Sequence, residues 1–189
     1  MLVGAAGVAN AQSTRFGVKA GVGLASVTGD AGSGVTKKSL IGAQAGLMAD
    51  FGLSDLISFH PELLYSQKGL RVEGSGFTSQ ARLSYLDLPL LLRVNADGLF
   101  FEAGPQVGLL IGQKNEATFN GTTLSSTSTD GTRKVDLGYI AGVGYQLSSG
   151  LEFGVRYNGG ISDLSDPSNS DKSRNSVFQF QVGYLFGGK

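Results

Sequence analysis

The sequence predicts an all-β fold, an eight-stranded antiparallel up-and-down β-barrel. Apolar residues alternate with polar residues or glycine along eight segments, and this period of two is that of a β-strand. Glycine accounts for 30 of the 189 residues, about twice its usual share. The connections between the segments alternate between long and short, and no segment of comparable length fits a helical period as well.

The eight expected strands span residues 16–25, 41–51, 57–66, 85–93, 99–109, 135–147, 151–158 and 178–186. In chain order their apolar faces begin at Phe16, Ile41, Ile57, Leu86, Leu99, Val135, Leu151 and Phe178, and apolar residues recur at every second position from there. The first two strands are rich in Gly and Ala, the fourth is a leucine run interrupted by Asp87 and Pro89, and the last two carry aromatic residues. At about 9–13 residues the strands exceed the globular mode of about 5–6 and approach the length of membrane strands.

The connections sort by length. Segments 27–38, 67–81, 113–132 and 162–174 are long and rich in turn residues, whereas 52–56, 94–98 and 148–150 are short. In an up-and-down barrel this alternation places all long loops at one end and both termini at the other. Short periplasmic turns and longer extracellular loops are typical of outer-membrane barrels.

The composition indicates which face points outward. The residues between the apolar positions are mostly Gly, Ser, Gln and Asn, and only 16% of the chain is charged, whereas a soluble surface carries about 25–35% charged residues. Aromatic residues gather at two levels of the apolar faces, as in the girdles of membrane barrels: Phe16, Phe51, Tyr145, Phe153 and Phe186 near the short turns, and Tyr65, Tyr139 and Tyr157 further along. We therefore expect a transmembrane barrel with its apolar face toward lipid. The alternative is a soluble lipocalin-like barrel with the faces inverted around a ligand.

The first residues have the pattern of a targeting segment. Residues 1–11 read MLVGAAGVANA, a small and apolar run that ends in the Ala-x-Ala pattern of a secretory cleavage site. We interpret them as the remnant of a signal peptide and residues 12–189 as the barrel domain. The expected location is the bacterial outer membrane.

Several segments resemble one known family. They are FHPELLYSQKG (59–69), YLDLPLLLR (85–93), LFFEAGPQVGLLIG (99–112), GYIAGVGYQLSSGLEFGVRYNGGISDL (138–164) and VFQFQVGYLF (177–186). Together they resemble the PorT-type outer-membrane β-barrel family, which is typical of the Bacteroidota. The resemblance implies an eight-stranded outer-membrane barrel. One branch of that family assists a secretion system for surface proteins, and most members have no assigned activity.

The alternation places a set of charged residues on the inward face. Lys19, Asp136 and Glu152 belong to it, and the expected polar network of the lumen consists of His60, Glu62, Asp87, Arg93, Glu102 and Arg156. Charges inside a narrow barrel must be paired or hydrated, because isolated burial costs several kcal/mol. An eight-stranded barrel is just wide enough for its own side chains. We therefore expect a network that fills the lumen, and the alternative is a path for protons, ions or small solutes.

Enzymatic chemistry has little support in the residues. The chain has no Cys, which excludes thiol catalysis and cysteine-ligated metals. Its single histidine, His60, shares a strand face with Ser58, Glu62 and Ser66, so a Ser–His–acid arrangement stays open, although no G-x-S-x-G motif accompanies it. One histidine and scattered carboxylates give no metal-ligand spacing, so we expect no metal and no cofactor.

The sequence thus predicts a non-enzymatic outer-membrane protein with a structural, adhesive or secretion-accessory role. Its extracellular loops are the expected interaction surface. The expected partners are outer-membrane lipid, the barrel-assembly machinery during insertion, and components of a secretion system. Nucleic acid is not expected, because 15 basic residues balance 15 acidic ones. A small-solute channel is the main alternative function.

Overall fold

A computed structural model of the chain describes residues 14–28, 36–74, 77–119, 122–127, 134–161 and 174–187. The proposed signal remnant, residues 1–11, lies outside these ranges. No helix among the described residues is long and apolar enough to cross a membrane.

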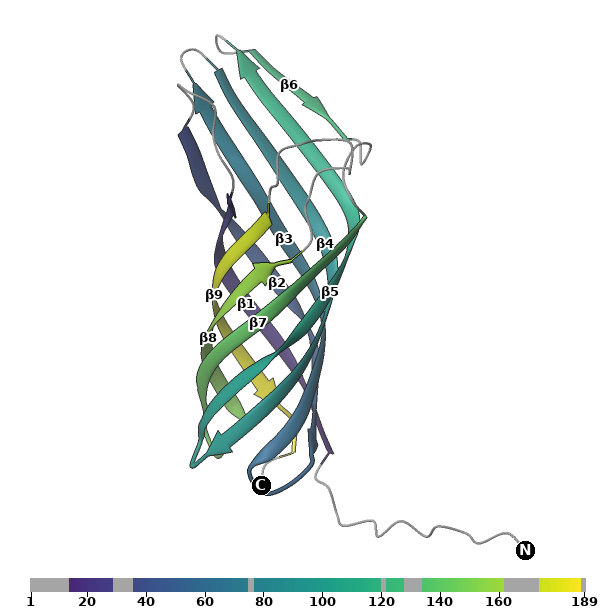
Figure 1. Cartoon of the computed structure of the whole chain (residues 1–189), viewed down its shortest axis with the longest axis vertical. Helices are drawn as coiled ribbons and strands as arrows, with labels where there is room; N and C mark the ends of the chain where they lie inside the picture. The colour runs from purple at the N-terminus through teal and green to yellow at the C-terminus, as the bar shows by residue number, and fades with distance from the viewer. Residues whose placement is uncertain are drawn as a thin grey trace, which may run out of the picture.

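The described residues form nine antiparallel strands (Figure 1). They are β1 (Thr14–Thr28), β2 (Thr36–Gly52), β3 (Ile57–Gly74), β4 (Phe77–Ala96), β5 (Leu99–Phe119), β6 (Thr122–Ser126), β7 (Val135–Gln146), β8 (Leu151–Gly160) and β9 (Arg174–Leu185). Eight of them pair in the order β4-β3-β2-β1-β9-β8-β7-β5, and β4 also pairs with β5, which closes the barrel. The eight-stranded antiparallel barrel predicted from the sequence is therefore confirmed.

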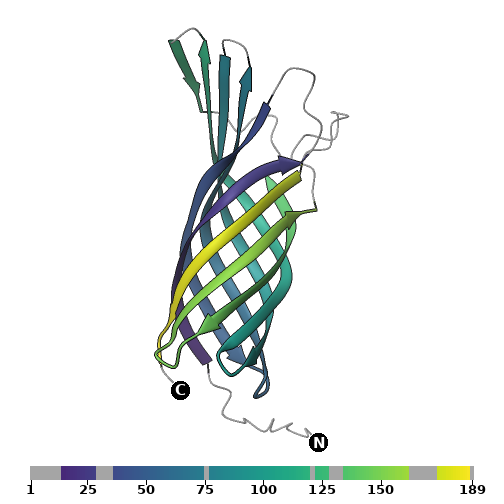
Figure 2. The same cartoon turned by 90° about the vertical axis from the view of Figure 1, so that its left-hand side faces the viewer.

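The barrel has one end built of tight turns, which we call the short-turn end. There β1 begins and β9 ends, and short connections join β2 to β3, β4 to β5, and β7 to β8 (Figures 1 and 2). Asp97 and Gly98 connect β4 to β5 with φ values of 48° and 90°. Positive φ at both central residues is the geometry of the two-residue hairpin turn that Asp-Gly favours.

At the opposite end β2, β3, β4 and β5 extend past the ends of β1, β7, β8 and β9 (Figure 2). β3, β4 and β5 are 18, 20 and 21 residues long, and β6 adds to the upper part of β5. The expectation that 67–81 and 113–132 are loops was therefore wrong over most of their length. Strand pairing continues there through backbone hydrogen bonds, and the polar side chains leave no apolar alternation to mark it.

The outward face is apolar over a band around the barrel. Along β4 the exposed side chains Leu86, Leu88, Leu90, Leu92 and Val94 follow one another at every second position. At about 3.4 Å per residue and a tilt of about 40°, these positions span about 21 Å along the barrel axis, close to the apolar band of about 25 Å of outer-membrane barrels.

Aromatic residues border this band at both edges. Phe51 lies 6.5 Å from Phe16 and 6.4 Å from Phe59 between ring centroids near the short-turn end. At the other edge the tyrosine hydroxyls meet the first polar outward side chains: Tyr65 Oη donates to Ser84 Oγ (3.1 Å). Apolar rings with a polar tip suit the boundary between hydrocarbon and headgroups.

The inward face is filled by side chains. Buried apolar residues include Leu64, Tyr85, Leu91, Phe100 and Leu185, each at most 1% exposed. Inward glycines provide their space: the Phe100 ring occupies the position that a Cβ on Gly144 would take. The high glycine content therefore serves the packing of a narrow lumen.

Candidate functional site in the barrel lumen

All six residues expected in the lumen lie on the inward face. His60, Glu62, Asp87, Arg93, Glu102 and Arg156 are between 0% and 3% exposed. They come from β3, β4, β5 and β8, and the alternation of each strand turns them inward. Lys19, Asp136 and Glu152, assigned to the same face, are 3%, 5% and 1% exposed.

Arg156 lies at the centre of the network and joins two glutamates across the lumen. Its Nη1 and Nη2 donate to Glu62 Oε2 (2.8 Å) and Oε1 (2.9 Å). Its Nε and Nη2 donate to Glu102 Oε1 (3.0 and 2.5 Å). Arginine presents donors in a rigid planar fork that suits two carboxylates at once. This residue therefore ties β8 to β3 and β5 through the interior.

Two further cations complete the arrangement around Glu152. Arg93 Nη1 donates to Glu152 Oε2 (2.7 Å) and Arg93 Nη2 to Glu102 Oε2 (3.1 Å). Lys19 Nζ donates to Glu62 Oε1 (2.5 Å) and lies 3.4 Å from Glu152 Oε1. We call the six residues Lys19, Glu62, Arg93, Glu102, Glu152 and Arg156 the central cluster.

The central cluster is electrically balanced, since three cations face three carboxylates. Their side chains are at most 2% exposed. Burying charge in this way is tolerable only when each ion has a partner and its hydrogen-bonding capacity is used. The cluster therefore forms an ionic plug that spans the interior, with the Arg93 guanidinium 3.9 Å from the centre of the Phe100 ring.

His60 lies beside this plug and contacts several charged groups. Its Nδ1 is 3.4 Å from Asp50 Oδ1, and its Nε2 is 3.2 Å from Arg93 Nη2 and 3.5 Å from Glu62 Oε1. A catalytic serine would have to meet the Nε2 atom. Instead Ser58 Oγ accepts from Asn95 Nδ2 (3.4 Å). In the part of the chain that the structure describes, the contacts of His60 are with Asp50, Glu62 and Arg93, and they do not assemble the three roles of a Ser–His–acid site.

Asp87 belongs to a second group nearer the long-loop end. Ser66 Oγ donates to Asp87 Oδ2 (2.5 Å), and Lys68 Nζ lies 3.2 Å from the same oxygen and 3.4 Å from Asp136 Oδ2. Lys68 also lies 4.6 Å from the centre of the Tyr85 ring. The structure thus separates Asp87 from the other five expected residues and joins it to Asp136.

Two members of the lumen network, Lys68 and Asp50, are not among the residues expected from the sequence. Lys68 is an even number of residues from His60 and Glu62 and therefore lies on the same face of the strand, but the predicted third strand ends at residue 66. Asp50 pairs with Arg15 at 2.7 Å near the short-turn end. Continuing the third strand by one more inward position would have found Lys68, whereas Asp50 already occupies an inward position of the predicted strand 41–51 and is missing only from the expected network. No group of three or more His, Cys, Asp or Glu that could hold a metal occurs in the part of the chain that the structure describes.

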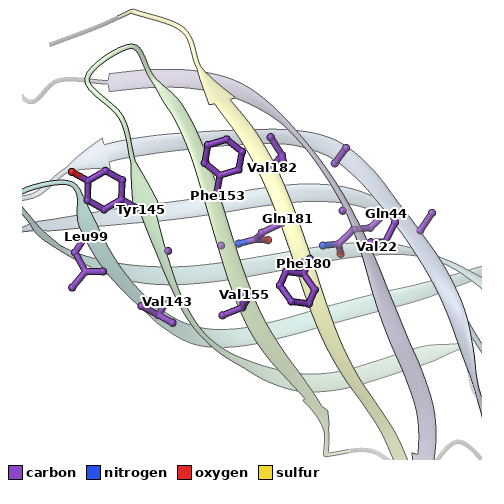
Figure 3. A pocket seen from close by; sticks show the side chains of 15 residues that line it. Val22, Gln44, Leu99, Val143, Tyr145, Phe153, Val155, Phe180, Gln181 and Val182 are labelled. Atoms are coloured by element: carbon purple, nitrogen blue, oxygen red, sulfur yellow. The ribbon is translucent and has the colours of Figure 1, made fainter.

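A hollow of about 780 Å³ lies on the outer wall. Two rows of paired outward side chains border it, Tyr145–Phe153–Val182 and Val143–Val155–Phe180, and Figure 3 shows Gln181 between the rows. Its lining is apolar apart from Gln44 and Gln181. Because it lies within the apolar band, this hollow suits the hydrocarbon chains of lipids rather than a polar substrate.

Comparisons with known proteins agree with this architecture. Residues 10–166 match the family of the outer membrane protein beta-barrel domain, and the chain belongs to this family. Among solved structures it is similar to Ail, the attachment invasion locus protein of Yersinia pestis, at 14% identity and a TM-score of 0.52, with 91% of this chain and 98% of Ail covered. It is also similar to Neisserial surface protein A at 14% identity and a TM-score of 0.50, with 93% and 100% covered.

A sequence search of curated proteins finds no match. At these identities the structural likeness concerns the fold. The family and the fold together place the protein in the bacterial outer membrane, with its apolar band in contact with lipid. The soluble lipocalin-like alternative is thereby excluded.

Proposed function

We propose that this protein is a non-enzymatic outer-membrane protein that docks an extracellular or secreted protein on the sheet raised beyond the membrane by β2–β6. The main observation behind this proposal is the position of β6 at the edge of the sheet. This strand is the last in the sheet order and pairs with β5. An unpaired strand edge is a template for a further strand, and peptide partners use such edges for recognition.

The chemistry of β6 favours docking. Its sequence, TTLSS, has neither a charge nor a proline, the residues that commonly protect an edge from pairing. Leu124 is 66% exposed and offers an apolar contact beside the backbone hydrogen bonds. A strand added here would lie outside the membrane, which suits a structural, adhesive or secretion-accessory role.

The lumen supports this assignment over its alternatives. A small-solute channel would require the central cluster to move aside, which would expose or unpair six buried charges. An enzyme centred on His60 would require a nucleophile that the Ser58 contacts do not provide. Within the outer-membrane family we propose membership of the PorT-type branch of the Bacteroidota, with lipid, the barrel-assembly machinery and secretion-system components as partners.

The register of β5 and β6 indicates which backbone groups face the free edge. Phe119 pairs with Thr122 across two residues, so this pair exchanges hydrogen bonds and every second pair after it does the same. The Leu124 amide then faces β5, and the Ser125 amide faces the free edge. Proline at position 125 removes an edge donor without breaking the hairpin.

The difference between the Leu124 and Ser125 amides allows docking at the free edge to be tested. A photo-crosslinking amino acid at position 124 is displayed on living cells, alone and combined with Ser125→Pro or with the matched control Ser125→Ala. We expect protein adducts of discrete mass that persist with Ser125→Ala and disappear with Ser125→Pro. Adducts that survive Ser125→Pro, or no discrete adduct in any of the three, would contradict docking at this edge.

A further inference from the structure

Two cations lie directly opposite each other on the outward face, just beyond the apolar band at the long-loop end. Arg82 of β4 pairs with Lys114 of β5, and both are exposed. They continue the outward positions of the band, since Arg82 and Ser84 precede Leu86 along β4 at steps of two residues. Like charges directly opposite each other on a sheet are destabilising, so an anion beside the pair would be stabilising.

The described neighbours compensate only part of this charge. Lys114 Nζ lies 2.7 Å from Glu116 Oε1, and this hydrogen bond and charge hold the pKa of Glu116 below its ordinary value. Arg82 instead faces the neutral amide of Gln80: with that amide turned to present its oxygen, Arg82 Nε and Nη2 donate to it at 2.5 and 3.1 Å. The Arg82 charge also helps to lower the pKa of Glu116, so this single carboxylate serves both cations and compensates only one of the two positive charges.

The height of the pair above the hydrocarbon matches lipid headgroups. Arg82 lies four residues beyond Leu86, which is about 10 Å along the barrel axis at the usual rise and tilt. Long basic side chains bend back toward the interface, so the guanidinium reaches a headgroup layer of about 5–7 Å. A protein partner above the membrane would not need cations turned sideways toward lipid.

Among the described residues, the exposed charges at the two edges of the band differ in sign. Lys134, whose carbonyl accepts from the Leu110 amide at 2.7 Å, brings a third exposed cation to the long-loop edge. At the short-turn end the exposed turns carry Asp55 and Asp97. The positive edge belongs to the extracellular side, because long loops of outer-membrane barrels are extracellular. Its charge favours anionic headgroups in the outer leaflet.

We propose that Arg82 and Lys114 bind the phosphate of a lipid headgroup in the outer leaflet. The guanidinium fork of Arg82 matches two phosphate oxygens, and the Lys114 ammonium adds a point charge on the same anion. The acyl chains of that lipid would lie against the leucine face of β4 below. The binding anchors the barrel at a fixed height and does not depend on what docks at β6.

The test measures lipid affinity of the folded full chain in neutral detergent by isothermal titration calorimetry. The probes are dimyristoyl phosphatidic acid, dimyristoyl glycerol, which lacks the phosphate, and inorganic phosphate. We expect binding of phosphatidic acid well above that of the other two. With about 1 kcal/mol per basic residue near an anionic surface, Arg82→Gln/Lys114→Gln should weaken it by about 30-fold.

Matched variants distinguish a specific phosphate site from a general effect of net charge on lipid affinity. Ser148→Asp/Ser149→Asp lowers the net charge by the same amount at the opposite end, in exposed turn positions, and should leave the affinity within about twofold. Glu116→Gln should tighten binding, because it releases Lys114. A shift in gel mobility on boiling verifies that each variant is folded. Equal binding of all three probes, tighter binding of inorganic phosphate, or equal losses in the two double variants would overturn the proposal.

Discussion

Removal of Arg156 tests whether the central cluster acts as one balanced ionic unit. In Arg156→Met the side chain volume is nearly retained, but Glu62 and Glu102 lose four hydrogen bonds of 2.5–3.0 Å from the guanidinium. The cluster then holds two cations against three buried carboxylates. Breaking a buried ion pair by removing one partner costs about 3–5 kcal/mol, and we expect that loss in the free energy of unfolding.

The decisive comparison adds Glu62→Gln. Alone, Glu62→Gln leaves three cations against two carboxylates and should cost a similar amount. In the double variant two cations, Lys19 and Arg93, face two carboxylates, Glu102 and Glu152, and the balance returns. We therefore expect the loss in the double variant to be smaller than the sum of the two single losses by about 0.5–3 kcal/mol, the range over which charges in one network couple.

Urea unfolding in lipid vesicles, followed by circular dichroism and by the mobility shift on boiling, measures these free energies. The chain has no Trp, so fluorescence would rest on tyrosine alone. If the losses of the two single variants simply add in the double variant, the charge balance of the cluster does not govern its stability. The ionic plug would then not act as one balanced unit.

Two further predictions concern the wall and its packing. Val182→Arg, at the middle of the outward positions of β9, should lower the free energy of unfolding by about 2–4 kcal/mol. Leu24→Arg, at the edge of the band toward the long loops, should cost about 0–1 kcal/mol. Equal losses in the same unfolding assay would contradict the placement of the band. Gly144→Ala should cost about 1–3 kcal/mol because the Phe100 ring fills the space of the new methyl group. The control Gly112→Ala, where the nearest neighbour is Ser84 Cβ at 3.9 Å, should change stability by no more than about 0.5 kcal/mol, and a loss as large as that of Gly144→Ala would argue against this packing explanation.

Much of the fold could be predicted because membrane contact makes the sequence periodic. Lipid requires an apolar residue at every second position within the band. The sequence therefore shows which residues of each strand face outward and which face inward. Even apolar residues such as Leu64, Leu91 and Phe100 could be assigned to the inward face from parity alone, and each is at most 1% exposed. The strands beyond the band have no such requirement, so the sequence predicts loops where these strands continue.

The hairpin of β5 and β6 did have a local signal. Asn120-Gly121 is the dipeptide most typical of a two-residue hairpin turn, and it stands between the paired residues Phe119 and Thr122. The bulge between β4 and β5 at Ser84/Tyr85 has no comparable signal in the sequence, because residues of any type can occupy the additional position of a bulge.

The partners inside the lumen could not be predicted from the sequence. Alternation places Arg156 and Glu62 on the inward face, but they are 94 residues apart in the chain. Which inward residues meet depends on the stagger between strands around the closed barrel, and that stagger follows from the complete register. The sequence therefore indicates that a polar network exists but not that Arg156 links Glu62 to Glu102.

Paired charges close the lumen, and we propose that the protein acts through its surfaces. Conductance of the folded protein in planar bilayers tests this closure, with insertion verified by the mobility shift on boiling. We expect a baseline equal to that of protein-free bilayers. Stable conductance steps from the wild-type chain would contradict it and would favour the small-solute channel.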